Sequence, residues 1–195
     1  EFESLPEFMR QAAAEAYETL LHGRDGQLCD VILDRAALEA VRDAGEKSKT
    51  GIIKDYARSL LVISNIKMAV RCCRTRKTLD FMKRAMVECE ELNVEKLMKA
   101  ALQGEGAIRD YLNEVGFKEA ADALFESSSA FECWCDNRLI ETIRPQKYNP
   151  FSVGPLIAYI LARENEIKTV RIILTGKQNG FPESAIRERM REMYV

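Results

Sequence analysis

Proline is missing from most of this sequence. The five prolines stand at positions 6, 145, 150, 155 and 182, so the stretch from Glu7 to Arg144 has none. Because proline breaks a helix from within, a proline-free stretch of this length is typical of helical proteins. The ten glycines fall between segments of helix length, where helices are expected to end. No segment shows the alternation of a β-strand, so the sequence predicts an all-α fold.

A strong net charge and a long apolar run are also lacking. Lysine and arginine number 29 and acidic residues 31, giving a net charge of -2 and a pI near 5.7, whereas nucleic-acid binders are usually more basic. The longest apolar run, residues 155–162, is far shorter than the roughly 20 residues that cross a bilayer. The acidic N-terminus has no signal-peptide pattern. We expect a cytoplasmic chain that neither binds nucleic acid nor inserts into a membrane.

The sequence is poor in residues that carry out catalysis or bind metals. Its single histidine, His22, lies far from the serine cluster at 127–129, so no serine nucleophile with a nearby base is predicted. The six cysteines include a vicinal pair, Cys72-Cys73, and the triplet 133–135, but not the well-spaced pairs of a four-ligand zinc site. We expect free thiols, no metal, no cofactor and no enzymatic activity.

The segment RIILTGKQNG, residues 171–180, allows two interpretations. It could be a strand followed by a phosphate-binding loop, or the end of a long helix. A P-loop requires a glycine five residues before its Gly-Lys pair and a serine or threonine after it, but Arg171 and Gln178 occupy those positions. We therefore predict a helix of about 21 residues that starts at Pro155 and ends at Gly176. Its apolar positions at helical spacing are Leu156, Ile160, Ile167, Val170 and Leu174.

Two other segments show helical periodicity. From Ile53, apolar residues recur every three or four positions and predict a helix with one buried face: Tyr56, Leu60, Ile63, Ile66 and Val70. The final segment, residues 181–195, is predicted as one more helix, with Ile186, Met190 and Met193 on one face.

Parts of the sequence occur twice. DVILDRAALEAVR (30–42) resembles ECWCDNRLIETIR (132–144) at an offset of 102, and LLVISNIK (60–67) resembles LARENEIK (161–168) at an offset of 101. The alternative is that amphipathic helices simply share composition. We predict two pseudo-symmetric helical units, 1–105 and 106–195.

Such a duplication suggests candidate contact residues. The turns after the two long helices, 72–77 and 174–180, would lie on the same rim and could contact a symmetric partner. The basic run around residue 74 could equally be a solvated helix end, or pair with the acidic run 88–95. The candidates for partner contact are Arg74, Arg76, Lys77, Lys177, Gln178 and Asn179.

A lysine beside apolar neighbours recurs in both copies, at Lys67 and Lys168. A shared structural role, such as snorkelling or an ion pair between helices, is favoured over a functional site. Aspartates recur too, so we predict the pairs Lys67–Asp34 and Lys168–Asp136.

Residues 149–195 contain the pattern YILARENEIKTVRIILTGKQNGFPES followed by IRERM. This pattern resembles the C-terminal end of the C subunit of the V-type and archaeal A-type ATP synthases, a relative of the d subunit of the eukaryotic V-ATPase. CDVILDRAALEAVR and NIKMAVR resemble the middle of that family, so the resemblance covers nearly the whole chain. Val62 and Cys72-Cys73 depart from the family pattern, which affects local packing more than identity.

The resemblance implies an all-α funnel of three helical units, of which this chain has two. The sequence is then expected to be a fragment without the N-terminal unit, with "EF" as a possible cloning remnant, and it could self-associate through uncovered apolar surface. The family's role implies a non-catalytic central-stalk subunit that joins the rotor shaft to the membrane ring during proton or sodium transport, peripheral to the membrane. The alternative is a helical-repeat adaptor that binds soluble partners.

Overall fold

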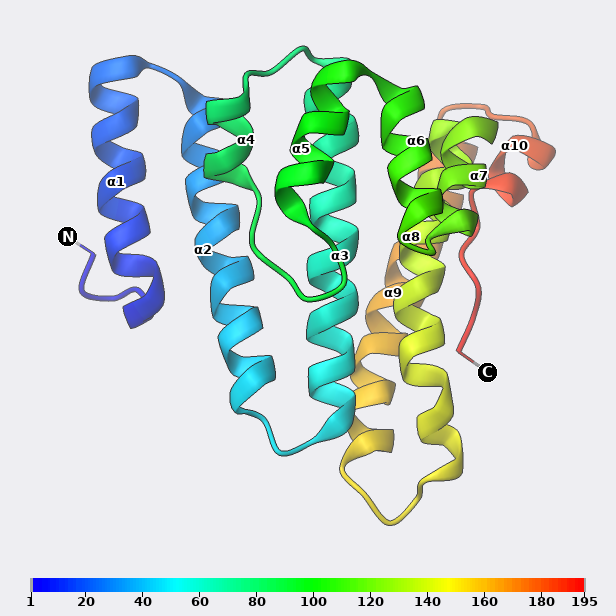
Figure 1. The fold of residues 1–195 in the computed structure, drawn as a ribbon. Helices are drawn as coiled ribbons and strands as arrows, with labels where there is room; N and C mark the ends of the chain where they lie inside the picture. Colours follow the sequence, from blue (N-terminus) through cyan, green and yellow to red (C-terminus); the bar gives the residue numbers. More distant parts are fainter. Residues whose placement is uncertain (1, 195) are drawn as a thin grey trace.

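A computed structural model describes residues 2–194 as helices joined by short connections (Figure 1). These residues contain no β-strand, so the prediction of an all-α fold is confirmed. The helices in chain order are α1 (Glu7–Gly23), α2 (Gly26–Lys47), α3 (Gly51–Arg74), α4 (Leu79–Ala85), α5 (Val94–Gln103), α6 (Glu105–Glu114), α7 (Lys118–Glu126), α8 (Ser128–Ile143), the 3-10 helix η1 (Arg144–Tyr148), α9 (Gly154–Gln178) and α10 (Glu183–Glu188).

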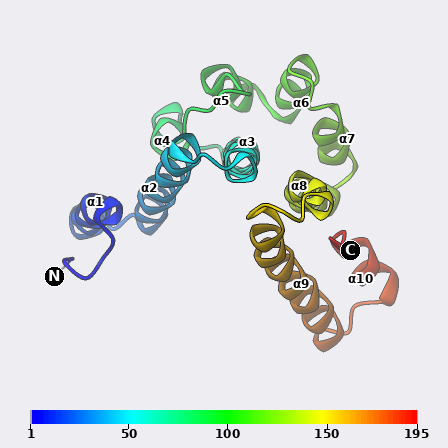
Figure 2. The same ribbon diagram turned by 90° about the horizontal axis from the view of Figure 1, so that it is seen from below.

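The helices form a curved wall that is open on one side (Figure 2). The long helices α1, α2, α3, α8 and α9 border the open side, and the shorter helices α4 to α7 and α10 lie outside them. Helices α5 and α6 pack on α3, and α7 packs on α8. The wall is therefore two helices thick over much of its length, with the long helices facing the opening.

The main core lies between α3 and the outer helices. Ile66 of α3, Leu97 of α5 and Ile108 of α6 are fully buried there. The apolar face predicted for α3 is buried at Ile63, Ile66 and Val70 and half-buried at its first positions. Burying side chains of this size contributes roughly 1.5–3 kcal/mol each, so this cluster dominates the stability of the wall.

A second, smaller cluster joins α8 to α9. Ile140 and Ile143 of α8 pack against Ala158 and Ala162 of α9. The small side chains let the two helices approach closely near the start of α9. Beyond that point α9 leans away from α8, and α10 with the C-terminal segment lies beside it on the outer side (Figure 2).

The predicted end of α9 at Gly176 is wrong. The helix continues to Gln178, and the chain turns at Gly180, where φ is +70°. The Phe181 N–H donates to the Gly176 carbonyl oxygen at 2.9 Å and closes this turn. Gly176 is glycine for another reason: Ile186 of α10 packs directly on it.

The predicted C-terminal helix is only partly formed. Helix α10 ends at Glu188, and residues 190–194 are not helical. Polar side chains of α8 and α9 bind the backbone of this segment, so those contacts replace the hydrogen bonds of a continued helix. The pattern of apolar residues alone carries no sign of this.

The order of helices repeats in the two halves of the chain. Two long helices and a short one follow each other as α2, α3 and α4, and again as α8, α9 and α10. Helix α2 starts at Gly26 and α8 at Ser128, a separation equal to the offset of the first sequence repeat. The pseudo-symmetric relation between units 1–105 and 106–195 stays a prediction.

Candidate docking surface

The face of α9 opposite its buried residues is apolar and exposed. Leu156, Ile160, Ile167 and Leu174 follow at helical spacing and are 48–64% exposed. The opposite face of α9, which packs against the body, carries small or polar residues instead, among them Ala158 and Ala162. The stripe that marks this helix in the sequence is therefore available to a partner.

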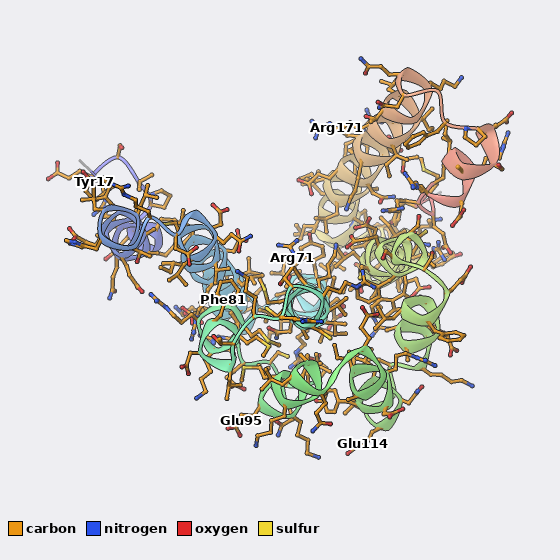
Figure 3. The ribbon with its side chains drawn as sticks, turned by 90° about the horizontal axis from the view of Figure 1, so that it is seen from above. Tyr17, Arg71, Phe81, Glu95, Glu114 and Arg171 are labelled. Carbon is orange, nitrogen blue, oxygen red and sulfur yellow. The ribbon has the colours of Figure 1, made fainter. Side chains whose placement is uncertain are left out.

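Two arginines lie on the open side of the wall. Arg71 of α3 and Arg171 of α9 both project toward the opening (Figure 3). Both are exposed, and neither takes part in the ion pairs formed within residues 2–194. Glu95 and Glu114 lie on the outer side in the same view. The open side thus presents positive charge beside aliphatic surface, which suits a partner with acidic and apolar groups.

Two of the basic rim candidates are engaged within the chain. Arg74 donates to both carboxylate oxygens of Glu105, at 2.7 and 3.3 Å, and to Ser128 Oγ at 2.8 Å. The hydrogen bond from Arg74 lowers the pKa of the Glu105 carboxyl. Lys77 donates to Gln27 Oε1 at 2.5 Å and lies 4.8 Å from the ring centroid of Phe81.

The ion pairs of the acidic run 88–95 and of the basic run around residue 74 are not formed with each other, although the sequence allowed that alternative. Glu90 pairs with Arg58 of α3 at 2.7 Å, whereas Arg74 pairs with Glu105 of α6. Arg76 is exposed and has a positive φ of 52°, at the turn after α3. Of the three basic candidates on this turn, Arg76 is thus the one left for a partner.

The other three rim candidates lie at the end of α9. Lys177, Gln178 and Asn179 are exposed, and Asn179 Nδ2 donates to the Thr175 carbonyl oxygen at 2.8 Å. Helices α3 and α9 run in the same direction, so both turns lie at the same end of the molecule (Figure 1). Their contact with a partner stays a prediction.

The structure forms one of the two expected lysine–aspartate contacts. Lys168 Nζ lies 2.5 Å from Asp136 Oδ1, and the Asp136 side chain is only 9% exposed. The expected Lys67–Asp34 pair is wrong, because Lys67 Nζ lies 2.5 Å from Glu132 Oε2. Lys67 is on the side of α3 that meets α8, whereas Asp34 is exposed on α2. The Lys67 ion pair therefore connects the two halves of the chain.

Two buried asparagines that the apolar periodicity did not indicate hold segments after the short helices. Asn65 Nδ2 donates to the Val87 carbonyl oxygen at 2.6 Å, and its Oδ1 accepts from the Val87 N–H at 3.0 Å. Asn165 Nδ2 donates to the Glu192 carbonyl oxygen at 2.8 Å. An amide inside an apolar helical run, as in LLVISNIK, is the signal that could have found Asn65. Asn65 and Asn165 are 100 residues apart, as are Arg71 and Arg171, which is one residue less than the offset that aligns LLVISNIK with LARENEIK.

All six cysteines are free, and the more buried ones are poorly suited to nucleophilic chemistry. Burial raises the pKa of Cys135 to about 12 and also raises the pKa of Cys72 and Cys89 above their ordinary value. Because the thiolate is the reactive form, these thiols are inert near neutral pH. Within residues 2–194, no group of three acidic, cysteine or histidine side chains is arranged to hold a metal ion.

No helix between residues 2 and 194 combines the length and the apolar composition needed to span a bilayer. The fold and the surface together define a curved helical scaffold with exposed arginines on its open side and exposed aliphatic residues on α9.

The sequence matches the ATP synthase (C/AC39) subunit family over residues 1–189, and the chain belongs to this family. It is 23% identical to the C subunit of the V-type sodium ATPase of Enterococcus hirae, an alignment that covers 98% of this chain and 58% of that protein. It is 27% identical to the C subunit of the A-type ATP synthase of Methanothermobacter thermautotrophicus over 83% of this chain and 45% of the relative.

A shorter alignment relates the chain to the C subunit of the A-type ATP synthase of Haloferax volcanii, with 37% identity over 37% of this chain and 20% of the relative. The chain thus spans about half the length of the first two relatives. A comparison with solved structures gave no significant match.

Proposed function

We propose that this chain is part of a non-catalytic central-stalk subunit of a rotary V- or A-type ATPase or ATP synthase. In this role it joins the rotor shaft to the membrane ring while protons or sodium ions are transported. The family, and relatives that are named as C subunits, support the assignment to such a complex. The chain would act at the membrane surface as a peripheral component.

The observation that carries the proposal is the open side of the wall. Arg71 and Arg171 face it, and the uncovered stripe of α9 lies next to Arg171 on the helix surface. A helical partner inserted there would bury aliphatic surface from one long helix and meet positive charge from two. The packing of α5 and α6 on α3, and of α7 on α8, makes the middle of the wall two helices thick, and the stiffness of such packing is what a part that transmits torque requires.

The alternative is a helical-repeat adaptor for soluble partners. Both functions would use the same open side, but only the first requires binding to the shaft or the ring of a rotary ATPase. Co-purification with those subunits therefore distinguishes them. The experiment is a pull-down with shaft subunits, using this chain and a full-length relative from the same family side by side.

Charge-reversal variants locate the contact. Arg71→Glu combined with Arg171→Glu is expected to weaken capture of the shaft about tenfold or more, since it places like charges in the interface. The matched control is Glu95→Lys with Glu114→Lys on the outer side, which is expected to leave capture unchanged. Equal loss in both double variants would count against the open side as the contact.

The rim candidates form a second part of the proposal. Arg76, Lys177, Gln178 and Asn179 are exposed on turns at the same end of the wall and would contact the shaft or the ring. Replacing Arg76 and Lys177 by alanine tests this contact without disturbing Arg74, whose guanidinium is engaged with Glu105 and Ser128.

A further inference from the structure

Residues 190–194, which we call the C-terminal strap, run without helical structure beside α8 and α9. Their sequence continues the apolar periodicity of α10, so a helix would be their intrinsic choice. The Arg191 side chain in this segment is only 8% exposed. An unstructured tail would leave an arginine in water, so specific contacts hold the strap in place.

Three of these contacts are hydrogen bonds to the main chain of the strap. The Glu192 N–H donates to Asn137 Oδ1 at 2.9 Å, and the Glu192 carbonyl oxygen accepts from Asn165 Nδ2 at 2.8 Å. Cys133 Sγ donates to the Met190 carbonyl oxygen at 3.3 Å. Asn137 and Cys133 belong to α8 and Asn165 to α9, so the main chain of one strap residue, Glu192, bridges the two helices.

The side chains of the strap also make specific contacts with the helices and with η1. Arg191 Nε lies 2.5 Å from Asp136 Oδ2, while Lys168 binds the other oxygen of the same carboxylate. Arg144 pairs with Glu192 at 2.7 Å. Tyr194 packs against the cluster around Ile140, and Lys147 lies 4.9 Å from its ring centroid. An arginine, an acidic residue and an aromatic residue are thus recognised in a fixed order.

The strap supports α9 where direct packing is thin. The apolar contact between α8 and α9 lies at Ala158 and Ala162, early in α9. Next to this contact, a cavity of about 140 Å³ lies between α3, α8 and α9, and Asp136, Asn165 and Lys168 are among its lining residues. Two residues that bind the strap, Asp136 and Asn165, therefore line a gap in the packing between α8 and α9.

We propose that Cys133, Asp136, Asn137 and Asn165 form a peptide-binding site for an extended segment of the type Arg-acidic-X-aromatic. The resident ligand is the chain's own strap, and its occupancy holds the distal half of α9 in position. The inference goes beyond the proposed function, because it assigns a ligand and a role to a site on the side of α8 and α9 away from the opening. It does not depend on the shaft as a partner.

The first experiment measures hydrogen exchange in the intact chain. In the wild type, the Glu192 amide is expected to exchange at least about 100-fold more slowly than in a free peptide, because its N–H is bonded to Asn137. Arg191→Met removes the charge and keeps the length of the side chain. It is expected to raise exchange in residues 190–194 and in the distal half of α9, but not in α2.

Arg187→Met is the matched control, since Arg187 is exposed on α10 and pairs only with Glu183 among residues 2–194. It is expected to leave α9 unchanged. Free exchange of the Glu192 amide in the wild type would overturn the proposal. So would unchanged exchange in α9 when Arg191→Met releases the strap, because the strap would then not position the helix.

The second experiment supplies the ligand in trans. A labelled peptide with the sequence of residues 189–195 is expected to bind the Arg191→Met chain, whose own strap competes poorly, and to restore slow exchange in α9. A peptide with methionine at the position of Arg191 is expected to bind at least about tenfold more weakly. Binding should be lost when Asp136→Asn is added to the Arg191→Met chain. Equal binding of both peptides, or binding of neither, would overturn the site.

Discussion

Gly176 of α9 lies so close to Ile186 of α10 that a Cβ atom on residue 176 would stand 2.7 Å from Ile186 Cγ1 and 3.0 Å from its Cδ1. This contact, and no requirement of the turn, keeps a glycine inside a helix at a cost of about 1 kcal/mol relative to alanine.

Gly176→Ala is therefore expected to destabilise the chain, because the added methyl displaces Ile186. In an Ile186→Ala background, the nearest remaining atom is the Cβ of residue 186 at 3.8 Å, an ordinary contact. There the same substitution should stabilise the chain by about 1 kcal/mol through helix propensity. Denaturant unfolding of the four members of this double-mutant cycle measures the change of sign. A stabilising effect in both backgrounds would contradict the packing.

Asn65 and Asn165 each hold a distant backbone segment by side-chain hydrogen bonds, and their contributions to stability can be compared. Asn65→Leu leaves both the N–H and the carbonyl oxygen of buried Val87 without their partner, while Asn165→Leu removes the partner of one carbonyl oxygen. Each unsatisfied buried group costs about 1–3 kcal/mol, so Asn65→Leu should cost more free energy of unfolding than Asn165→Leu.

The control for this pair is Asn113→Leu, an exposed position on α6, which should change stability by about 0.5 kcal/mol or less. Urea unfolding gives all three values. An equal loss of unfolding free energy in Asn65→Leu and Asn113→Leu would contradict a stabilising role for the Asn65 hydrogen bonds.

The Lys67 and Lys168 ion pairs are expected to contribute little to the free energy of unfolding. The lysine side chains are 30% and 49% exposed, and Asp136 keeps Arg191 as a partner when Lys168 is removed. Lys67→Met and Lys168→Met should each lower the melting temperature through a loss of about 1 kcal/mol or less, without changing assembly. Lys99→Met, at an exposed lysine of α5, is the control. A loss several times larger would mean that these lysines have another role.

Alkaline pH should destabilise the chain through Cys135. Burial raises the pKa of its thiol from 9.0 to about 12, so the folded chain keeps the proton where the unfolded chain has lost it. Stability from this group is complete below pH 9 and falls by about 1.4 kcal/mol per pH unit between pH 9 and 12. Unfolding measured from about pH 8 to 10.5 should show a shallower decline in Cys135→Ala than in the wild type. Parallel declines would contradict the shift.

Uncovered apolar surface on α9 should make the chain self-associate. Ile160 and Leu174 are 53% and 61% exposed on the free face of this helix. Ile160→Glu with Leu174→Glu is expected to lower the apparent mass in light scattering at high concentration. The control is Leu102→Glu on α5, also 53% exposed but in the outer layer. A wild-type chain that stays monomeric would exclude this association.

Much of the fold follows from local patterns in the sequence. Missing proline and the periodicity from Ile53 onward are enough to predict the helical class and the buried face of α3. The end of α9 is misplaced by sequence patterns because glycine serves both as a helix terminator and as a place for close packing, and only the position of Ile186 decides between them.

The candidate site is harder to predict, because it depends on which helices meet. Whether Lys67 reaches Asp34 or Glu132 is decided by the packing of α3 against α8, which no local pattern contains. The same holds for Arg171: its exposure on the open side follows from the curvature of the whole wall. For the strap, tertiary hydrogen bonds override an apolar repeat that by itself favours a helix.

The contact through Ala158 and Ala162 makes the beginning of α9 a fulcrum. Arg171 lies thirteen residues beyond Ala158, about 20 Å along the helix axis. A larger side chain at Ala158 would push the start of α9 away from α8 and tilt the helix. Because Arg171 lies far along the helix axis, a small tilt would displace it more than it displaces the start of α9. A substitution of the buried Ala158 thus changes the position that Arg171 presents to another molecule, without altering any residue that this molecule contacts.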